Sequence, residues 1–480
     1  MSKTNDEEIE EYSLNGGLVR VRILQKGGTI TYNVEEEKPD SDENKKINGL
    51  INRFRQANVD RNAGKHVSFH ESSEYYGALT DREKYFLDRY YLGYGMLQPL
   101  LGDPRIEDIS CDGANIPVFV FIKEYGYIRT NISFNTEDSL NFFIRKLVQD
   151  GGKQISVSVP VVETAIKDGS RVSASLGRYI TTRGPSFSIR KFREVPMSPV
   201  DLMKLGTANS LTLAYLWILI EYGANLMVVG GTATGKTTFL NAILSFVSPD
   251  KKIVTIEDTR ELNLKHENWI STVTRTFGSE GGNENQQMVE INMFDLLESA
   301  LRHRPNYIVV GEVRGVETFT VFQAMLAGRF GMGTFHADDI ETFIHRLEAR
   351  PISIPRTLIT SLNTAVILDT YYSEGRMQRR VKELSEIVDV DPGTGELVIN
   401  MLTSAGRQET TSSTFDSYAF RVIAAREGVS YSEMVREMFL RRDVLERLSE
   451  RNITDFGEVR RYISLVGSDE KRALEMLGLH

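Results

Sequence analysis

The pattern of apolar and polar positions changes several times along the chain, and each change marks a segment. Apolar and polar residues alternate over 18–23, and an acidic, polar run follows over 35–46. Segments that are rich in charge and poor in apolar residues are typically mobile. We therefore expect 1–47 to be an acidic, partly flexible N-terminal segment that binds partners and is dispensable for catalysis.

From Thr80 onward the apolar residues recur with helical spacing, and this pattern ends near Gly93. Short apolar runs with strand spacing come next, so we expect 48–194 to form a small α+β domain. The predicted elements are strands over 117–122, 155–159 and 187–190 and a helix over 140–148.

Two prolines, Pro196 and Pro199, interrupt regular structure and predict a linker over 195–204. Continuous apolar runs then alternate with helix-like stretches. Strands that are buried on both faces have this pattern, so 205–395 is predicted to be an α/β domain with a parallel sheet. Its clearest strands are 226–229, 253–256 and 308–310.

The last part of the chain is charged and helix-like, and we expect 396–480 to be a helical C-terminal extension. Ser430 and Glu433 have the spacing of a capping box, in which two side chains close the first turn of a helix. A helix is therefore predicted to begin there.

The composition indicates several domains in a reducing compartment. A chain of 480 residues with 41% hydrophobic composition holds enough apolar material for more than one core. Its single cysteine, Cys111, excludes an internal disulfide. The net charge of −9 argues against a surface devoted to nucleic-acid phosphates, so no nucleic-acid partner is expected.

Neither a leader nor a membrane span is predicted. Residues 1–11 are mostly acidic and polar, unlike a signal peptide. The most apolar window, 211–220, is about half the roughly 20 residues that a transmembrane helix needs. We therefore expect a cytoplasmic protein whose contact with a membrane is peripheral.

The strongest chemical signal is GGTATGKT at 230–237, which follows an apolar strand and precedes a helix-like stretch. It fits the P-loop pattern, in which glycines let the backbone wrap around phosphate. Lys236 adds a positive charge, and the hydroxyl of Thr237 can bind Mg²⁺. The residues predicted to bind the nucleotide are Gly231, Thr232, Ala233, Thr234, Gly235, Lys236, Thr237 and Thr238.

A nucleoside triphosphatase also needs an acidic group near the metal and the attacking water. Glu312 closely follows the apolar strand 308–310, and the ends of parallel strands meet at the edge of the sheet that carries the P-loop. We predict that Glu312 activates or orients water. A second acidic cluster, 257–261, follows another apolar strand, although by itself it also fits the start of a helix.

Four motifs occur in the order found in one known family. They are the P-loop at 230–237, an acidic box at 255–261, Gly-Glu at 311–312 where many NTPases have Asp, and GTFHAD at 333–338. The chain resembles the secretion ATPase superfamily, which includes type II secretion, type IV secretion, type IV pilus and archaellum motors.

The resemblance covers roughly 97–387. Segments 99–109, 168–172 and 188–192 look like the N-terminal domain of the family. Within the family, 257–269 looks most like the archaeal branch.

The resemblance implies an α/β fold with a RecA-like P-loop ATPase domain and a homohexamer that hydrolyses ATP with Mg²⁺. Each nucleotide would lie between the N-terminal and ATPase domains. Force would act on a polytopic inner-membrane platform protein, together with other cytoplasmic components of the machine. Glu257, Asp258 and Glu261 would lie near the metal, with Asp258 as a ligand beside Thr237, and Glu312 would lie near the γ-phosphate.

The resemblance also implies that His336 couples the nucleotide state to neighbouring elements. Many members have His where this chain has Arg329, which is a departure from the family pattern. Arg171, Arg183 and Arg190 precede the linker, and we predict that they clamp the triphosphate. The histidines lack metal-ligand spacing, so no zinc site is expected. Several arginines could act as an arginine finger on a neighbouring subunit, and none of them is assigned that role. They are Arg302, Arg304, Arg314, Arg346 and Arg356.

Two other function classes share the P-loop. A DNA-dependent ring ATPase, such as a helicase or a DNA-transfer motor, would add a basic channel studded with aromatic residues, and this acidic chain shows no clear one. A regulatory module that binds nucleotide without turnover would not need Glu312. Stimulation by single-stranded DNA and steady-state phosphate release distinguish these classes from a secretion motor.

Overall fold

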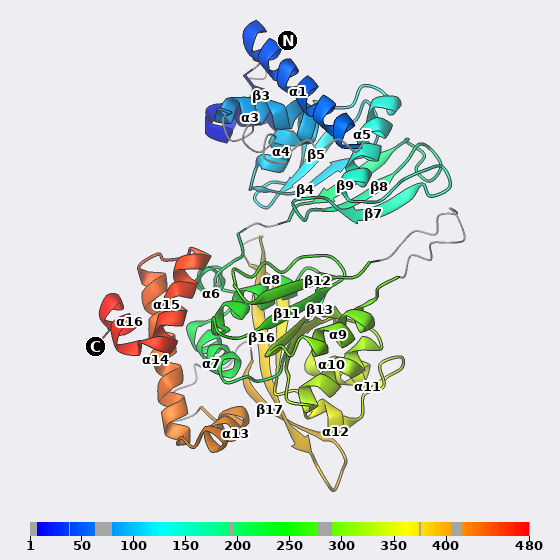
Figure 1. Ribbon diagram of the computed structural model, residues 1–480. Coiled ribbons are helices and arrows are strands. Elements are labelled where there is room, and N and C mark those ends of the chain that lie inside the picture. Colours follow the sequence, from blue (N-terminus) through cyan, green and yellow to red (C-terminus); the bar gives the residue numbers. More distant parts are fainter. Residues whose placement is uncertain are drawn as a thin grey trace. The chain divides into compact units, whose positions relative to one another are not determined.

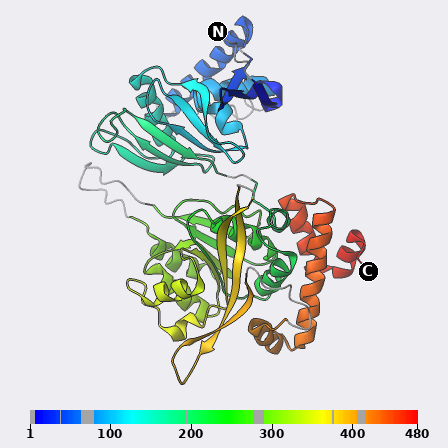
Figure 2. The ribbon, with the colours of Figure 1, turned by 180° about the vertical axis from the view of Figure 1, so that it is seen from behind.

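The computed structural model describes residues 7–37, 39–62, 79–192, 195–275, 290–373, 376–404 and 415–479. The chain divides into two compact units, Met1–Phe192 and Arg193–His480 (Figures 1 and 2). Each unit has its own sheet and its own buried apolar clusters. More than one core is therefore present, as the composition predicts.

The first unit is built on a nine-stranded sheet in the order β1-β2-β3-β6-β5-β4-β9-β8-β7. Only β3 and β6 pair in parallel among its described strands. Its strands are β1 (Glu7–Leu14), β2 (Val19–Lys26), β3 (Thr29–Glu36), β4 (Ile106–Cys111), β5 (Pro117–Ile122), β6 (Gly126–Ser133), β7 (Val161–Ala165), β8 (Arg171–Ser175) and β9 (Ser186–Arg190). Its helices are η1 (Asn15–Gly17), α1 (Ser41–Asn62), α3 (Asp81–Leu87), η2 (Asp88–Leu92), η3 (Gly95–Leu97), α4 (Gln98–Gly102) and α5 (Glu137–Asp150).

Residues 1–47 are predicted to be an acidic, partly flexible segment, but the part that the structure describes, 7–37 and 39–47, is built into the first unit. Strands β1, β2 and β3 continue the sheet, and β3 joins it through β6. The hydroxyls of Tyr12 and Tyr32 donate to the buried carboxyl of Asp103 at 2.5 and 2.6 Å. Val19, Val21 and Tyr32 have no exposed surface, so these strands are part of the core. The dispensability of the segment for catalysis stays a prediction.

Most local predictions for this unit are confirmed. Thr80 caps α3 in a capping box, and the predicted strands 117–122 and 187–190 correspond to β5 and β9. The predicted helix 140–148 lies within α5.

The strand predicted at 155–159 is wrong. The backbone of Ser156 donates to Val159 O at 3.1 Å, and Val159 N donates back to the Ser156 hydroxyl at 3.2 Å. These local bonds form a turn that replaces the ladder of a strand.

The second unit is built on an eight-stranded sheet in the order β12-β11-β13-β14-β10-β15-β16-β17. The pairs from β12 to β15 are parallel, and β16 and β17 extend the sheet as antiparallel strands. Its strands are β10 (Leu226–Gly230), β11 (Ile253–Glu257), β12 (Trp269–Val273), β13 (Tyr307–Val313), β14 (Phe330–Phe335), β15 (Thr364–Ser373), β16 (Arg376–Val390) and β17 (Leu397–Ser404).

Alternate residues of the central strands enter two different apolar clusters. In β10, Leu226 and Val228 belong to one cluster, and Met227 and Val229 belong to the other. The prediction of a parallel sheet covered on both faces is therefore confirmed. The covering helices are α6 (Pro199–Lys204), α7 (Ser210–Glu221), α8 (Lys236–Ile243), η4 (Leu244–Phe246), α9 (Met293–Arg302), α10 (Glu317–Leu326), α11 (Ile340–Glu348) and α12 (Arg356–Ile359).

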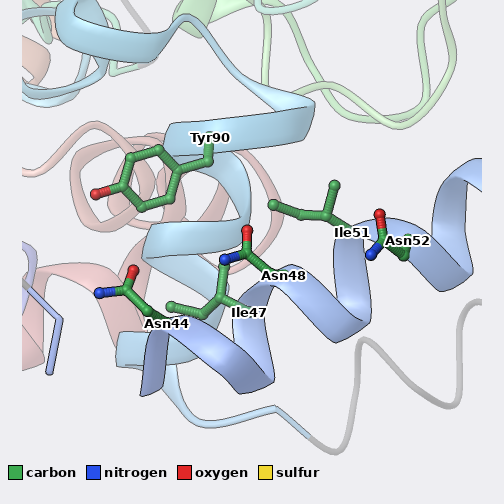
Figure 3. A pocket seen from close by; sticks show the side chains of 6 residues that line it. All are labelled: Asn44, Ile47, Asn48, Ile51, Asn52 and Tyr90. Carbon is green, nitrogen blue, oxygen red and sulfur yellow. The ribbon is translucent and has the colours of Figure 1, made fainter. Parts of the chain in front are cut away.

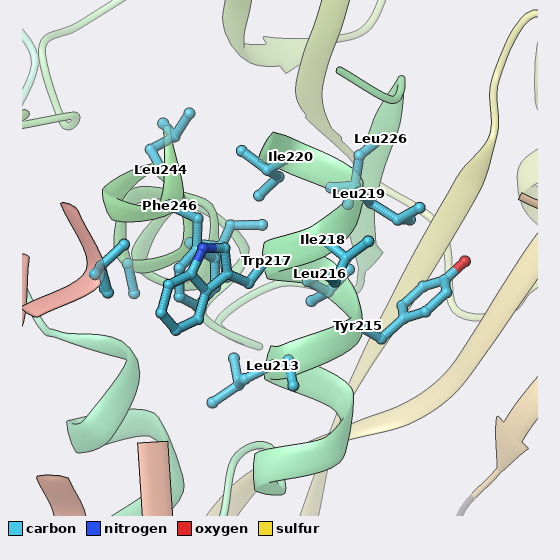
Figure 4. Packing of buried hydrophobic residues seen from close by; sticks show 14 of the residues in the cluster. Leu213, Tyr215, Leu216, Trp217, Ile218, Leu219, Ile220, Leu226, Leu244 and Phe246 are labelled. Atoms are coloured by element: carbon cyan, nitrogen blue, oxygen red, sulfur yellow. The ribbon is translucent and has the colours of Figure 1, made fainter. Parts of the chain in front are cut away.

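The most apolar window of the chain, 211–220, lies in α7 and is packed inside this unit. Figure 4 shows Trp217 beside Phe246, and their stacked ring centroids are 5.3 Å apart. Within the described residues, no helix has the length and apolarity needed to cross a membrane. The apolar window is thus explained by burial in the core.

The C-terminal part starts later than predicted, because β17 is a strand that pairs with β16. Helices α13 (Tyr418–Glu427), α14 (Tyr431–Glu450), α15 (Phe456–Ser468) and α16 (Glu470–Leu477) follow. The predicted capping box of Ser430 and Glu433 opens α14. The nearly buried guanidinium of Arg441 in α14 pairs with Glu221 of α7 at 2.9 Å, which ties these helices to the sheet domain.

Candidate functional site

The P-loop connects the buried strand β10 to α8. In residues 231–235, Ala233 (φ 63°) and Gly235 (φ 87°) adopt the left-handed conformation. Such a conformation costs a residue with a side chain about 1–2 kcal/mol. Gly235 precedes α8 and offers no capping side chain, so the first N–H groups of the helix remain for an anion.

Two glycines of the motif lie close to residues from other segments. A Cβ on Gly230 would lie 2.8 Å from the carbonyl oxygen of Leu368, and a Cβ on Gly231 would lie 2.9 Å from Asp338 Oδ1. Gly231 is therefore the point where the P-loop meets the predicted 333–338 motif.

Lys236 lies where the predicted motifs converge. Its ammonium donates to Gly231 O at 2.8 Å. Burial lowers the pKa of Lys236, and the nearby carboxylates of Glu312, Asp338 and Glu261 oppose this shift. Carboxylates from three separate segments thus act electrostatically on the P-loop cation. The predicted Thr237 follows it and is half-buried, whereas Thr232 and Thr238 are exposed.

Glu257 ends β11 and is 2% exposed. Its Oε1 accepts the backbone N–H groups of Glu261 and Leu262, both at 2.8 Å. Burial raises the pKa of Glu257 to about 7, although these two bonds oppose the shift. Among the described residues nothing bonds to its buried Oε2. A buried oxygen without a partner fits a site that receives a water molecule or a cation.

Gly311 is the neighbour that lets Glu257 sit beside β13. A Cβ on Gly311 would lie 3.0 Å from Glu257 Cγ, and the Gly311 carbonyl accepts the Thr334 hydroxyl at 2.6 Å. The acidic box, the Gly-Glu pair and the 333–338 motif are therefore in direct contact.

Arg314 joins the predicted catalytic and metal-binding acids. Its guanidinium lies 3.2 Å from Glu312 Oε2 and 2.9 Å from Asp258 Oδ2. Sequence reasoning named Arg314 only among candidate arginine fingers. No spacing in the sequence indicates this contact, because Arg314 lies just beyond the end of β13, where the alternation of a strand no longer sets the direction of a side chain. The turn itself is held by Glu317, whose Oε1 accepts the N–H groups of Arg314 and Gly315.

His336 directly follows the buried strand β14 and is half-buried. Its carbonyl accepts from Arg346, whose guanidinium lies 5.4 Å from the centroid of the Phe335 ring. A coupling role of the His336 ring stays a prediction. Arg329 reaches the carbonyl of Pro305 at 3.5 Å, away from the motif residues.

The three arginines predicted to clamp the triphosphate belong to the first unit. Arg171 and Arg190 face each other across β8 and β9, and both are exposed. Arg171 also pairs with Glu163 at 3.0 Å. Arg183 is exposed in the loop before β9. The sheet therefore brings two of the three together as cross-strand neighbours.

A cavity of about 460 Å³ lies elsewhere in the first unit, where α1 faces η2 (Figure 3). It is unrelated to the P-loop segment. Its lining residues are Asn44, Ile47, Asn48, Ile51, Asn52 and Tyr90.

Comparisons with known proteins agree with these motifs. The family described as "Type II/IV secretion system protein" matches residues 93–374. An uncharacterized protein of Methanocaldococcus jannaschii is 37% identical over 385 residues, which are 79% of this chain and 68% of that protein. A putative conjugal transfer protein of Mycobacterium tuberculosis is 30% identical over 269 residues, which are 54% of this chain and 72% of that protein.

Among solved structures, the Legionella pneumophila ATPase DotB is 16% identical with a TM-score of 0.43, covering 73% of this chain and 87% of that one. The family match extends over more than half of the chain, from before β4 to just past the end of β15. The chain therefore belongs to the family of type II/IV secretion system proteins.

Proposed function

We propose that this chain is an ATP-hydrolysing motor subunit that powers assembly or secretion by a type IV pilus-like, archaellum or type II secretion-like machine. The observation that carries the proposal is the position of Lys236. It stands at the uncapped start of α8, within electrostatic reach of Glu312, Asp338 and Glu261. A cation, free helical N–H groups and several carboxylates in one place are the parts that phosphoryl transfer requires.

The loop from Gly231 to Thr238 would hold the phosphates through its N–H groups, and Lys236 would neutralise part of their charge. Thr237 and Asp258 would be ligands for Mg²⁺, with Glu257 and Glu261 near them. The donor set fits such an ion, because hydroxyl and carboxylate oxygens are its preferred ligands. When bound, Mg²⁺ would neutralise charge that develops on the phosphates.

Glu312 is the residue that we assign to the attacking water. It is held at the end of β13 by Arg314, so its carboxylate keeps a defined orientation. A carboxylate fixed in this way can accept a hydrogen bond from water and direct its oxygen toward phosphorus. Glu257 supports the same region from inside the sheet.

The finer parts of the proposal rest on family membership. They are a homohexamer, a polytopic platform protein in the inner membrane, other cytoplasmic components of the machine, and a peripheral position on the cytoplasmic face of the membrane. His336 would couple nucleotide state to its surroundings, and Arg171, Arg183 and Arg190 would supply positive charge to the triphosphate.

Steady-state phosphate release from MgATP tests the proposal. We expect turnover by the wild-type chain and a loss of at least a hundredfold in Lys236→Ala, because the phosphates lose their cation. Lys251→Ala is the matched control, since Lys251 pairs with Asp250 in the loop before β11. Equal turnover by Lys236→Ala and the wild type would contradict a P-loop mechanism.

A second experiment separates the motor from its alternatives. Vesicles that carry the platform protein should stimulate turnover, whereas single-stranded DNA should not. Stimulation by DNA alone would favour a DNA-dependent ring ATPase. Nucleotide binding with no turnover under any condition would favour a regulatory module.

A further inference from the structure

Arg379 of β16 contacts the P-loop in a way that none of the sequence motifs indicates. Its Nε donates to the carbonyl oxygen of Ala233 at 3.0 Å. Its Cδ lies 3.2 Å from the place where a Cβ on Gly235 would be. One side chain therefore touches both left-handed residues of the loop, Ala233 and Gly235.

The strand register explains how Arg379 arrives there. Strand β15 is parallel to β10, with Leu368 opposite Gly230, and it continues past the end of β10. Strand β16 returns antiparallel, with Arg379 opposite Thr370. Figure 2 shows this pair as the long yellow and gold ribbons of the second unit. The β15–β16 hairpin thus carries Arg379 to the level of the P-loop.

The loop has a physical need for such a contact. A left-handed conformation is unfavourable for alanine, because its Cβ approaches the following carbonyl oxygen. The N–H dipoles of a phosphate-binding loop also converge on one point and repel each other until an anion arrives. A hydrogen bond from a charged donor to Ala233 O opposes both effects, since it fixes the peptide that follows Ala233.

We propose that Arg379 is a positioning residue that holds the P-loop in its phosphate-binding shape before nucleotide enters. The proposal rests on the function proposed above, because the loop must be a nucleotide site for its shape to matter. Arg379 acts through Ala233 and Gly235, so its loss should weaken nucleotide binding more than it slows turnover at saturating ATP.

The neighbouring Arg380 is a matched control. It lies in the same strand but pairs with Asp369 at 3.7 Å and stacks over the Tyr371 ring at 4.5 Å. Removing it takes away the same charge from the hairpin without touching the P-loop. If Arg379→Ala weakened nucleotide binding only by removing a positive charge, Arg380→Ala would therefore weaken it equally.

Titration of the full chain with a fluorescent ADP in the presence of Mg²⁺ provides the test. We expect Arg379→Ala to weaken binding about tenfold, the size of one hydrogen bond from a charged donor. Arg380→Ala should bind as the wild type does. Glycine adopts the left-handed conformation without the steric cost, so Arg379 should matter less when residue 233 is glycine. The double variant Arg379→Ala/Ala233→Gly should therefore bind nearly as tightly as Ala233→Gly alone.

Three outcomes would overturn the proposal. They are unchanged binding by Arg379→Ala, an equal loss in Arg380→Ala, or a loss in Arg379→Ala that Ala233→Gly does not restore. Lys236→Ala in the same titration separates this failure from that of the proposed function. If Lys236→Ala loses binding while Arg379→Ala does not, the nucleotide site stands and only the role of Arg379 is wrong. If Lys236→Ala binds as tightly as the wild type, the P-loop is not the nucleotide site.

Discussion

Arg314 Nε lies 3.2 Å from Glu312 Oε2, and the same guanidinium reaches Asp258 at 2.9 Å. The acid that we propose directs water, Glu312, and the proposed metal ligand, Asp258, are thus linked by one side chain. Both ion pairs are partly exposed, so they add little to the free energy of unfolding and act mainly by orienting the two carboxylates. Arg314 therefore holds the Glu312 carboxylate at the edge of the sheet that carries the P-loop.

Changing Glu312 to Gln should separate binding from turnover. The amide keeps the shape of the side chain and removes the charge that orients water. We expect affinity for MgATP within about threefold of the wild type and a loss of turnover of two orders of magnitude or more. Nucleotide titration together with phosphate release measures both quantities. Normal phosphate release by this variant would show that Glu312 has only a structural role.

Glu257 should make stability depend on pH. Its pKa is raised from 4.5 to about 7 in the folded chain, so the folded state binds more protons than the unfolded state between these values. The free energy of unfolding therefore falls as pH rises through this window, and it has fallen by the full amount above about pH 7. Each unit of pKa corresponds to about 1.4 kcal/mol, so the total is on the order of 3 kcal/mol.

The variant Glu257→Gln lacks this titration. We expect its melting temperature, relative to that of the wild type without nucleotide, to rise as pH increases from about 5 to about 8. Any cost of fitting the amide is the same at every pH, so the slope is the test. A difference that stays constant across the range would mean that Glu257 is not buried in its neutral form.

The bond between Tyr32 and Asp103 should stabilise the N-terminal strands. Tyr32→Phe removes a buried donor to a carboxyl group, at a cost of about 2 kcal/mol. Amide hydrogen exchange in β2 and β3, measured by mass spectrometry, should accelerate more than tenfold. Tyr127→Phe is the control, since Tyr127 is 62% exposed. Equal exchange rates in the two variants would show that Asp103 does not anchor these strands.

The arginines of the first unit provide a test of the clamp. We expect Arg171→Ala and Arg190→Ala to lower ATP affinity or turnover about tenfold each, through lost charge-assisted hydrogen bonds. Small-angle scattering should show a smaller ATP-dependent change in these variants. Arg178→Ala is the matched control, because Arg178 is exposed and pairs with Glu137 in the same unit. If all three variants respond to ATP as the wild type does, the arginines do not clamp ATP. The ATP-dependent change in shape would then be driven from within the second unit.

The local parts of the site could be predicted from sequence. The P-loop, the acidic box and Glu312 each depend on a short run of residues that directly follows an apolar strand. Parallel strands end at a common edge, so their relative positions follow from strand type alone. The predictions for β5, β9, α5 and the cap of α14 succeeded for the same reason, since each pattern is contained within a few turns or a single strand.

The tertiary structure decided which distant residues meet. Nothing near Tyr32 indicates a partner at Asp103, and the alternation over 18–23 does not by itself show that β1 to β3 join the sheet of the first unit. The link between Arg314, Glu312 and Asp258, and the contact of Arg379 with Ala233, depend on sheet order and register. Register is set by the burial of whole strands and not by short motifs. The sequence by itself therefore determined the chemistry of the P-loop segment, and the fold determined which side chains hold that chemistry in place.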